Sequence, residues 1–179
     1  MTDHFAALGL PRRAWLDPED IKSRHHALIA AGHPDKPTGD AALAASLNTA
    51  RATLENPASR LRHLLELEAP GFVPQKKHEP DWAVFARLSD AARAAAEPKN
   101  PPPASPLARA LHLDKTRKLA AELDSLATLL AAKTAELEAL TRSAPPPSVD
   151  PAPAALLAEA WSFHLKSLAT LRQSRERTQ

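Results

Sequence analysis

The sequence predicts an all-α protein, and three features of its composition support this. The chain is 44% hydrophobic but only 4% aromatic, with no Tyr, so its core must be built largely from Leu and Ala, which favour helices. Only four Gly are present to punctuate strands. The 18 Pro gather in clusters, as is typical of linkers, because the ring fixes φ and removes a hydrogen-bond donor. We therefore expect helices separated by Pro-rich connections.

Charge and Cys content restrict the classes of function. The formal charge is +2 with a pI of about 9.1, and the basic residues are spread along the chain. Nucleic-acid binding usually needs a concentrated basic face, so we expect none. The absence of Cys excludes disulfides, Cys-ligated zinc and thiolate ligation of a cluster by this chain. No secretory signal or bilayer-spanning apolar run is visible, so we expect a soluble, cytoplasmic protein without membrane contact or cofactor.

Two helices are predicted in the first thirty residues. The first is short, because Gly9 can end it and Pro11 blocks its continuation. The second has a clear start, since Asp17 is a good N-cap and Pro18 suits the first helical position. One side of it is apolar at helical spacing: Ile21, His25, Leu28, Ile29 and Gly32. We expect this stripe to be buried, with the His25 ring packed and hydrogen-bonded.

A third and a fourth helix follow. Asp40 can cap the third, whose apolar residues should pack antiparallel against the second helix: Leu43, Leu47, Ala50 and Leu54. Asn56-Pro57 supplies an N-cap and a first-position Pro for the fourth. Its apolar residues are Leu61, Leu64, Leu65 and Leu67.

The tripeptide His33-Pro34-Asp35 lies between the second and third predicted helices. Together with the flanking helices and Asn56-Pro57, it makes residues 3–67 resemble a J domain, the DnaJ-type module that stimulates ATP hydrolysis by DnaK-type heat-shock chaperones. The connection between the first two helices is longer than in a typical J domain. Its Gly9-Leu10-Pro11, a spacer and then Leu16-Asp17 resemble the HscB family of iron–sulfur co-chaperones.

The resemblance implies which residues meet the chaperone. An exposed basic face of the second helix would contact an acidic surface of the ATPase domain through Lys22, Arg24 and His26. His33-Pro34-Asp35 would dock at the junction of the ATPase domain and the interdomain linker, where Asp35 would offer its carboxylate to a chaperone Arg. Because His26 is mostly neutral near pH 7, we expect modest, salt-sensitive affinity.

The remaining chain predicts a helical bundle. Residues 68–80 are a linker interrupted by Pro, and a helix is expected over residues 81–97, with Trp82, Phe85, Leu88 and Ala92 on one side. A long helix from Pro106 to about Ser143 carries Leu119, Leu123, Leu126, Leu130, Leu137 and Leu140 in a heptad-like pattern broken at Lys133. A last helix after Asp150 offers a similar seam: Leu157, Trp161, His164, Leu165, Leu168 and Leu171.

Short connections between these helices favour an antiparallel hairpin or a three-helix bundle, with a homodimeric coiled coil as the alternative. The predicted organisation is therefore a J domain at residues 1–67, a linker at 68–80 and a C-terminal bundle at 81–179. In the HscB family the bundle binds the scaffold on which iron–sulfur clusters are assembled. Here a client or scaffold surface would include Trp82, Phe85 and Leu88; the alternative is that these residues form the core of the bundle.

Three hypotheses of function follow. The first is an HscB-like co-chaperone that delivers an iron–sulfur scaffold protein to a DnaK-type ATPase. The second is a J-domain co-chaperone with a different client, and the third is a helical interaction protein with a degenerate J domain. An enzyme is disfavoured, because the sequence contains no recognisable nucleophile arrangement, phosphate loop or metal cluster.

Overall fold

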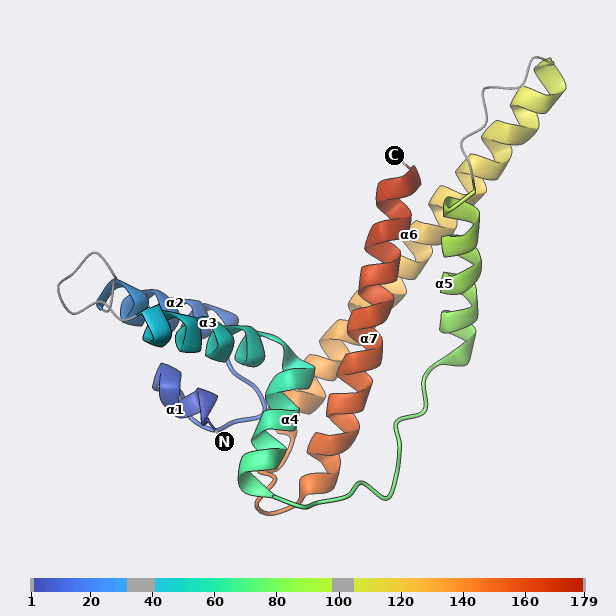
Figure 1. The fold of residues 1–179 in the computed structure, drawn as a ribbon. Helices are drawn as coiled ribbons and strands as arrows, with labels where there is room; N and C mark the ends of the chain where they lie inside the picture. The colour runs from blue at the N-terminus through green and yellow to red at the C-terminus, as the bar shows by residue number, and fades with distance from the viewer. Residues whose placement is uncertain (1, 32–40, 98–104, 179) are drawn as a thin grey trace. The chain divides into compact units, whose positions relative to one another are not determined.

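The structure, a computed structural model, describes residues 2–31, 41–97 and 105–178 (Figure 1). Within these ranges every regular element is a helix, which confirms the all-α fold. The helices are α1 (His4–Leu8), α2 (Pro18–Ala31), α3 (Ala41–Glu55), α4 (Pro57–Glu68), α5 (Trp82–Ala95), α6 (Pro106–Ser143) and α7 (Pro151–Thr178). None of the helices in these ranges combines the length and the apolar character that crossing a lipid bilayer would require.

The chain divides into two compact units. The first contains Met1–His78 and Leu137–Trp161, and the second contains Glu79–Glu136 and Ser162–Gln179. Helices α6 and α7 thus contribute one end to each unit. Each unit combines two separate segments of the chain, whereas the predicted domains at residues 1–67 and 81–179 are continuous in sequence. The predicted domain boundaries stay a prediction.

Capping residues mark both ends of α1 and the start of α2. Asp3 Oδ1 accepts hydrogen bonds from the backbone N–H groups of Phe5 and Ala6, at 3.0 and 3.1 Å. Gly9 adopts a left-handed conformation with a φ of 62°, which ends α1 at little steric cost. Asp17 Oδ1 accepts from the N–H of Glu19 at 2.9 Å and so caps α2.

The apolar stripes of α1 to α4 converge on one core in the first unit. Its most buried members are Phe5, Leu8, Ile21, Leu47, Ala50, Leu54, Leu61 and Leu64. The prediction for Leu43 was wrong, because this side chain is 45% exposed. Leu43 belongs to the first turn of α3, and a terminal turn has packing neighbours on one side only. On α2, Leu28 and Ile29 are half-buried, whereas Ile21 and His25 are buried.

A buried arginine holds two segments of the first unit together. Arg60 on α4 is 5% exposed, and its Nε donates to the carbonyl oxygen of Ala14 at 2.8 Å. Its Nη1 donates to the carbonyl oxygen of Leu54, near the end of α3, at 2.6 Å. Burial lowers the pKa of Arg60 to about 10, so the guanidinium still carries its charge at neutral pH. The guanidinium charge of Arg60 is thus stabilised by two backbone carbonyl oxygens, and these oxygens in turn receive hydrogen bonds from it.

The ends of α6 and α7 that belong to the first unit meet through a polar contact. The indole Nε1 of Trp161 donates to the hydroxyl of Thr141 at 2.9 Å, and both side chains are buried. The predicted seam placed Leu140 here, but Leu140 is 47% exposed while Thr141 is 1% exposed. A straight helix turns once in about 3.6 residues, so a strict 3.5-residue repeat drifts around its surface and the seam moves by one position.

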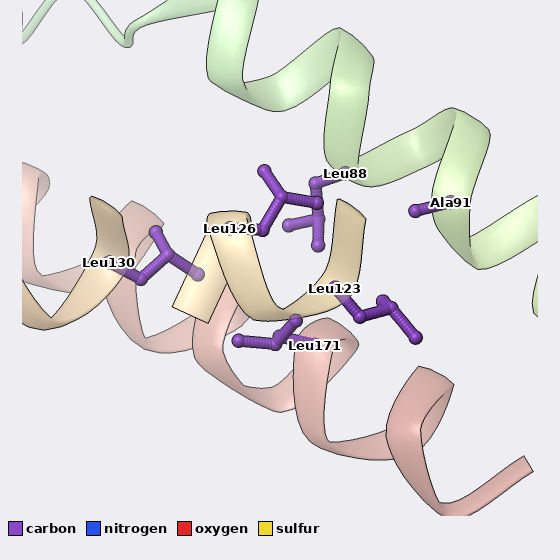
Figure 2. Close-up of a cluster of buried hydrophobic side chains, with 6 residues drawn as sticks. All are labelled: Leu88, Ala91, Leu123, Leu126, Leu130 and Leu171. Carbon is purple, nitrogen blue, oxygen red and sulfur yellow. The ribbon is translucent and has the colours of Figure 1, made fainter. Parts of the chain in front are cut away.

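In the second unit, α5, α6 and α7 share one apolar core, as expected for a three-helix bundle. The buried side chains are Leu88 and Ala91 from α5, Leu123, Leu126 and Leu130 from α6, and Leu171 from α7 (Figure 2). Figure 2 shows the side chains of Leu88 and Leu126 projecting into the space between their helices. The seam continues at Thr134, whose hydroxyl donates to the carbonyl of Leu130 and lies 2.8 Å from Nε2 of His164.

An ion pair fixes α5 against α6 beside this core. Arg87 Nε donates to a carboxylate oxygen of Glu122 at 2.8 Å, and a second guanidinium nitrogen donates to the hydroxyl of Ser125 at 3.0 Å. The hydrogen bond from Arg87 holds the pKa of the Glu122 carboxyl below its usual value. Because the Arg87–Glu122 pair is partly exposed, it adds little to the free energy of unfolding and mainly fixes the alignment of α5 along α6.

Candidate functional site

The outward face of α2 carries the three side chains predicted to meet a chaperone. Lys22, Arg24 and His26 are all exposed. Lys22 Nζ lies 2.7 Å from a carboxylate oxygen of Glu19, and this hydrogen bond raises the pKa of Lys22. Part of the positive charge on the face is therefore balanced within the helix, one turn earlier. A partner carboxylate has to compete with Glu19 for this ammonium group.

Two adjacent histidines of α2 have opposite environments. His25 is 5% exposed, and its Nε2 lies 2.9 Å from the side-chain oxygen of Asn48 on α3. His26 is exposed. The predicted packed and hydrogen-bonded ring of His25 is therefore confirmed. His25 positions α2 against α3, and the neighbouring side chain remains accessible to a partner.

The tripeptide His33-Pro34-Asp35 and the predicted cap Asp40 lie outside the described residues. In the chain order they fall between the end of α2 at Ala31 and the start of α3 at Ala41. The predicted chaperone-binding roles of Lys22, Arg24, His26 and the tripeptide all stay predictions.

A second candidate surface is formed by aromatic side chains of the second unit. Trp82 is 65% exposed and Phe85 is 43% exposed, although they are large and apolar. Their rings meet edge to face with a centroid distance of 5.9 Å. On α7, the half-buried ring of Phe163 lies 5.7 Å from the ring of Phe85. We call Trp82, Phe85 and Phe163 the aromatic patch.

The predicted apolar face of α5 was rotated relative to the observed one. Of the predicted face, Leu88 is buried and Ala92 half-buried, whereas Trp82 and Phe85 are exposed and the other buried side chains are Ala91 and Ala95. The interpretation of Trp82 and Phe85 as bundle core was therefore wrong. Leu88 is 2% exposed and packs into the core, so it supports the helix from inside the bundle. Its assignment to a client surface, like that of the two aromatic residues, stays a prediction.

Sequence reasoning missed Phe163. It lies between Trp161 and His164 in the sequence and is not part of the predicted seam of α7. The available signal was the presence of one more aromatic side chain in a chain that is only 4% aromatic. Its proximity to Phe85, on a helix almost eighty residues earlier, appears only in the folded bundle.

Comparison of the sequence with known proteins finds similarity to a co-chaperone. No family model matches the chain. The co-chaperone protein HscB of Proteus mirabilis (strain HI4320) is 32% identical over 89 residues, which cover 45% of this chain and 51% of that protein. The match thus spans about half the length of the curated relative.

Comparison of the fold extends over nearly the whole chain. Chaperone HscB from Vibrio cholerae aligns with a TM-score of 0.65 at 19% identity, covering 98% of each chain. The crystal structure of human co-chaperone protein HscB aligns with a TM-score of 0.58 at 16% identity, covering 97% of this chain and 84% of that one. In the aligned part of its sequence and in its fold, this chain is therefore similar to HscB co-chaperones, which confirms the resemblance predicted from its motifs.

Proposed function

We propose that this protein is a J-type co-chaperone that stimulates the ATPase of a DnaK-type chaperone and delivers to it an iron–sulfur cluster assembly scaffold. The observation that carries this proposal is the position of His33-Pro34-Asp35 between α2 and α3, in a chain that shares its fold with HscB over 98% of its length. The protein itself performs no chemistry in this proposal. It shifts the populations of the chaperone toward the state that hydrolyses ATP.

In this proposal, two separate surfaces bind the chaperone and the scaffold. Lys22, Arg24 and His26 on α2 meet an acidic surface of the chaperone, and the tripeptide docks beside them. His25 supports this arrangement from behind, because its hydrogen bond to Asn48 ties α2 to α3. The aromatic patch of the second unit binds the scaffold, since exposed aromatic side chains supply large contact areas at low conformational cost.

The chaperone half of the proposal is tested by single-turnover ATP hydrolysis with the DnaK-type chaperones of the same organism. Wild type should accelerate hydrolysis, and the His33→Gln variant should not. Arg172→Gln, which removes an exposed charge from α7, is the matched control and should retain full stimulation. If no chaperone responds to wild type, the degenerate J domain becomes the better description.

The ion pair on α2 gives a finer test of the same surface. Replacing Lys22 with Gln should weaken binding to the chaperone, because an attractive charge is removed. Replacing Glu19 with Gln should strengthen it, since Lys22 loses the internal partner at 2.7 Å. Both effects should shrink at high salt, as expected for exposed charges. Equal affinities for the two variants would contradict an electrostatic role for this face.

The client half is tested by titrating the scaffold protein by calorimetry. The double variant Trp82→Ala, Phe85→Ala should lose most of the affinity, because truncated aromatic anchors typically cost about 2 kcal/mol or more each. Leu129→Ala on α6 is a suitable control, since Leu129 is 40% exposed, close to the 43% of Phe85. ATPase stimulation without any scaffold binding by wild type would favour the second hypothesis, a different client.

A further inference from the structure

A cavity in the first unit combines cationic and apolar walls. It has a volume of about 320 Å³ and lies between the connection from α1 to α2 and the end of α6 with its Pro-rich turn. Arg12, Arg13 and Trp15 face it from the connection, and Arg142 faces it from α6. The volume is in the range of small-molecule sites, which begin at about 300 Å³. Neither the proposed chaperone-binding face nor the aromatic patch contributes to this cavity.

The cationic wall is held in place by its neighbours. The guanidinium carbon of Arg142 lies 4.5 Å from the centroid of the Trp15 ring, in a cation–π contact. Stacking on the indole occupies the face of the guanidinium, and its Nη2 lies 3.5 Å from a carboxylate oxygen of Glu138, so a ligand would use the remaining N–H groups or compete with this exposed pair. Arg12 is positioned by Asp3, which accepts from its Nη2 at 2.7 Å. A third guanidinium, that of Arg13, completes the set, and no acidic side chain lines the cavity.

The other wall is apolar. It is lined by the half-buried side chains of Trp15, Ala144 and Pro145, which keep accessible apolar surface, whereas Leu64 and Pro147 are almost fully buried. A bare inorganic anion would leave this part of the space filled only by water. A molecule that places a hydrophobic group against Trp15, Ala144 and Pro145 would gain the free energy of apolar burial in addition to its ionic contacts.

We propose that this cavity binds a small organic anion, in which a carboxylate or phosphate head meets the guanidinium groups and an apolar body covers Trp15, Ala144 and Pro145. The planar fork of Arg suits such heads because it donates two parallel hydrogen bonds to them. The same chemistry is offered by a free metabolite and by the carboxyl terminus of a polypeptide that ends in an apolar residue.

Phenyl phosphate is the first probe, and the indole N–H signals in ¹H–¹⁵N NMR spectra are the readout. The signal of Trp15 is assigned by its loss in a Trp15→Phe variant, and that of Trp82, in the second unit, is an internal reference. We expect saturable movement of the Trp15 signal with no movement of the Trp82 signal. Inorganic phosphate should bind at least about tenfold more weakly, because it lacks the apolar body.

Substitutions of Arg142 test whether the cationic wall is responsible for binding phenyl phosphate. Arg142→Gln should raise the Kd for phenyl phosphate about tenfold, and Arg142→Lys should also weaken binding because it removes the planar stack. Arg172→Gln, which changes net charge equally, should leave the Kd unchanged. These arginines are exposed, so the variants should fold. Movement of the Trp15 signal that does not saturate, or an equal Kd for wild type and Arg142→Gln, would overturn the proposal.

A peptide with a C-terminal Phe distinguishes the two sources. If the free acid competes with phenyl phosphate and the corresponding amide does not, the site accepts a polypeptide terminus. If neither peptide competes while phenyl phosphate binds, the occupant is a free small molecule. Both outcomes support the site, whereas equal affinity for inorganic and phenyl phosphate would contradict its apolar half.

Discussion

Trp161 and Thr141 form a buried hydrogen-bonded pair where α7 faces the end of α6. The indole Nε1 donates to the hydroxyl at 2.9 Å, and the hydroxyl donates to the carbonyl oxygen of Leu137 at 2.6 Å. Trp161 is 5% exposed and Thr141 is 1% exposed. Because a displaced register would leave the indole N–H buried without this acceptor, the pair selects one alignment of the two helices.

Thr141→Val is expected to destabilise the protein by roughly 1–3 kcal/mol, the usual cost of a buried donor without a partner. Valine has a similar shape, so the loss arises from the hydrogen bond rather than from a cavity. Urea denaturation followed by circular dichroism measures the change. The control is Thr128→Val on the same helix, where an exposed hydroxyl donates to the backbone carbonyl of Asp124. Equal losses in both variants would contradict a special role for Thr141.

Arg60 yields a prediction for the first unit. Arg60→Met should destabilise the fold by about 2 kcal/mol or more, because the buried carbonyl of Ala14 loses its donor while the apolar volume is largely retained. Arg60→Lys should be almost as damaging, since one ammonium group cannot reproduce the two directed bonds of the guanidinium.

The neighbouring Arg62 provides the control for this experiment. It lies on the same helix but is exposed, so Arg62→Met should change stability by less than about 0.5 kcal/mol. Stabilities are again compared by urea denaturation. If both substitutions have the same small effect, the carbonyls of Ala14 and Leu54 are satisfied without Arg60.

Capping chemistry made much of the fold predictable from local sequence. Asp3, Asp17, Asn56 and Asp81 all accept backbone hydrogen bonds at the starts of their helices, and Gly9 ends α1 as expected. These interactions join residues that are at most three apart. They therefore follow from short sequence patterns alone.

Which side of a helix is buried was predicted less well. Thr141 is buried where the heptad pattern predicted Leu140, because a real helix drifts from a heptad repeat. A shift of one residue moves a side chain by about 100° around the helix. Trp82 was interpreted as a core residue of α5, yet it is 65% exposed and the buried side chains of this helix are Leu88, Ala91 and Ala95. The contacts of Trp15 with Arg142 and of Phe85 with Phe163 join distant segments, which no local pattern reveals.

His63 gives the stability a dependence on pH. Its Nε2 accepts from the backbone N–H of His4 at 3.1 Å, so a proton on this nitrogen would abolish the bond. Burial lowers the pKa of His63, and the nearby His4 lowers it further, while Glu66 and Asp3 oppose the shift. The unfolded chain, with an ordinary pKa of about 6.5, then binds the proton first as the pH falls.

Stability from this group is therefore complete above about pH 6.5 and decreases as the pH falls through that value, until the folded protein also takes up the proton. The His63→Gln variant should lose less stability than wild type between about pH 7.5 and pH 5. His112→Gln, at an exposed position on α6, should behave like wild type. The measurement is the free energy of unfolding in urea at several pH values, and parallel curves for all three proteins would exclude His63 as the source.

The core of the second unit allows a comparison of two identical residues on one helix. Leu126 is 0% exposed and contacts the shared core of α5, α6 and α7, whereas Leu129, one turn later, is 40% exposed. Leu126→Ala should cost about 2–5 kcal/mol, since it removes transfer free energy and leaves a cavity among close-packed Leu side chains. Leu129→Ala has the same change in helix propensity but should cost less than about 1 kcal/mol. Thermal unfolding measures both, and similar losses would mean that α6 is not packed between α5 and α7 as Figure 2 shows.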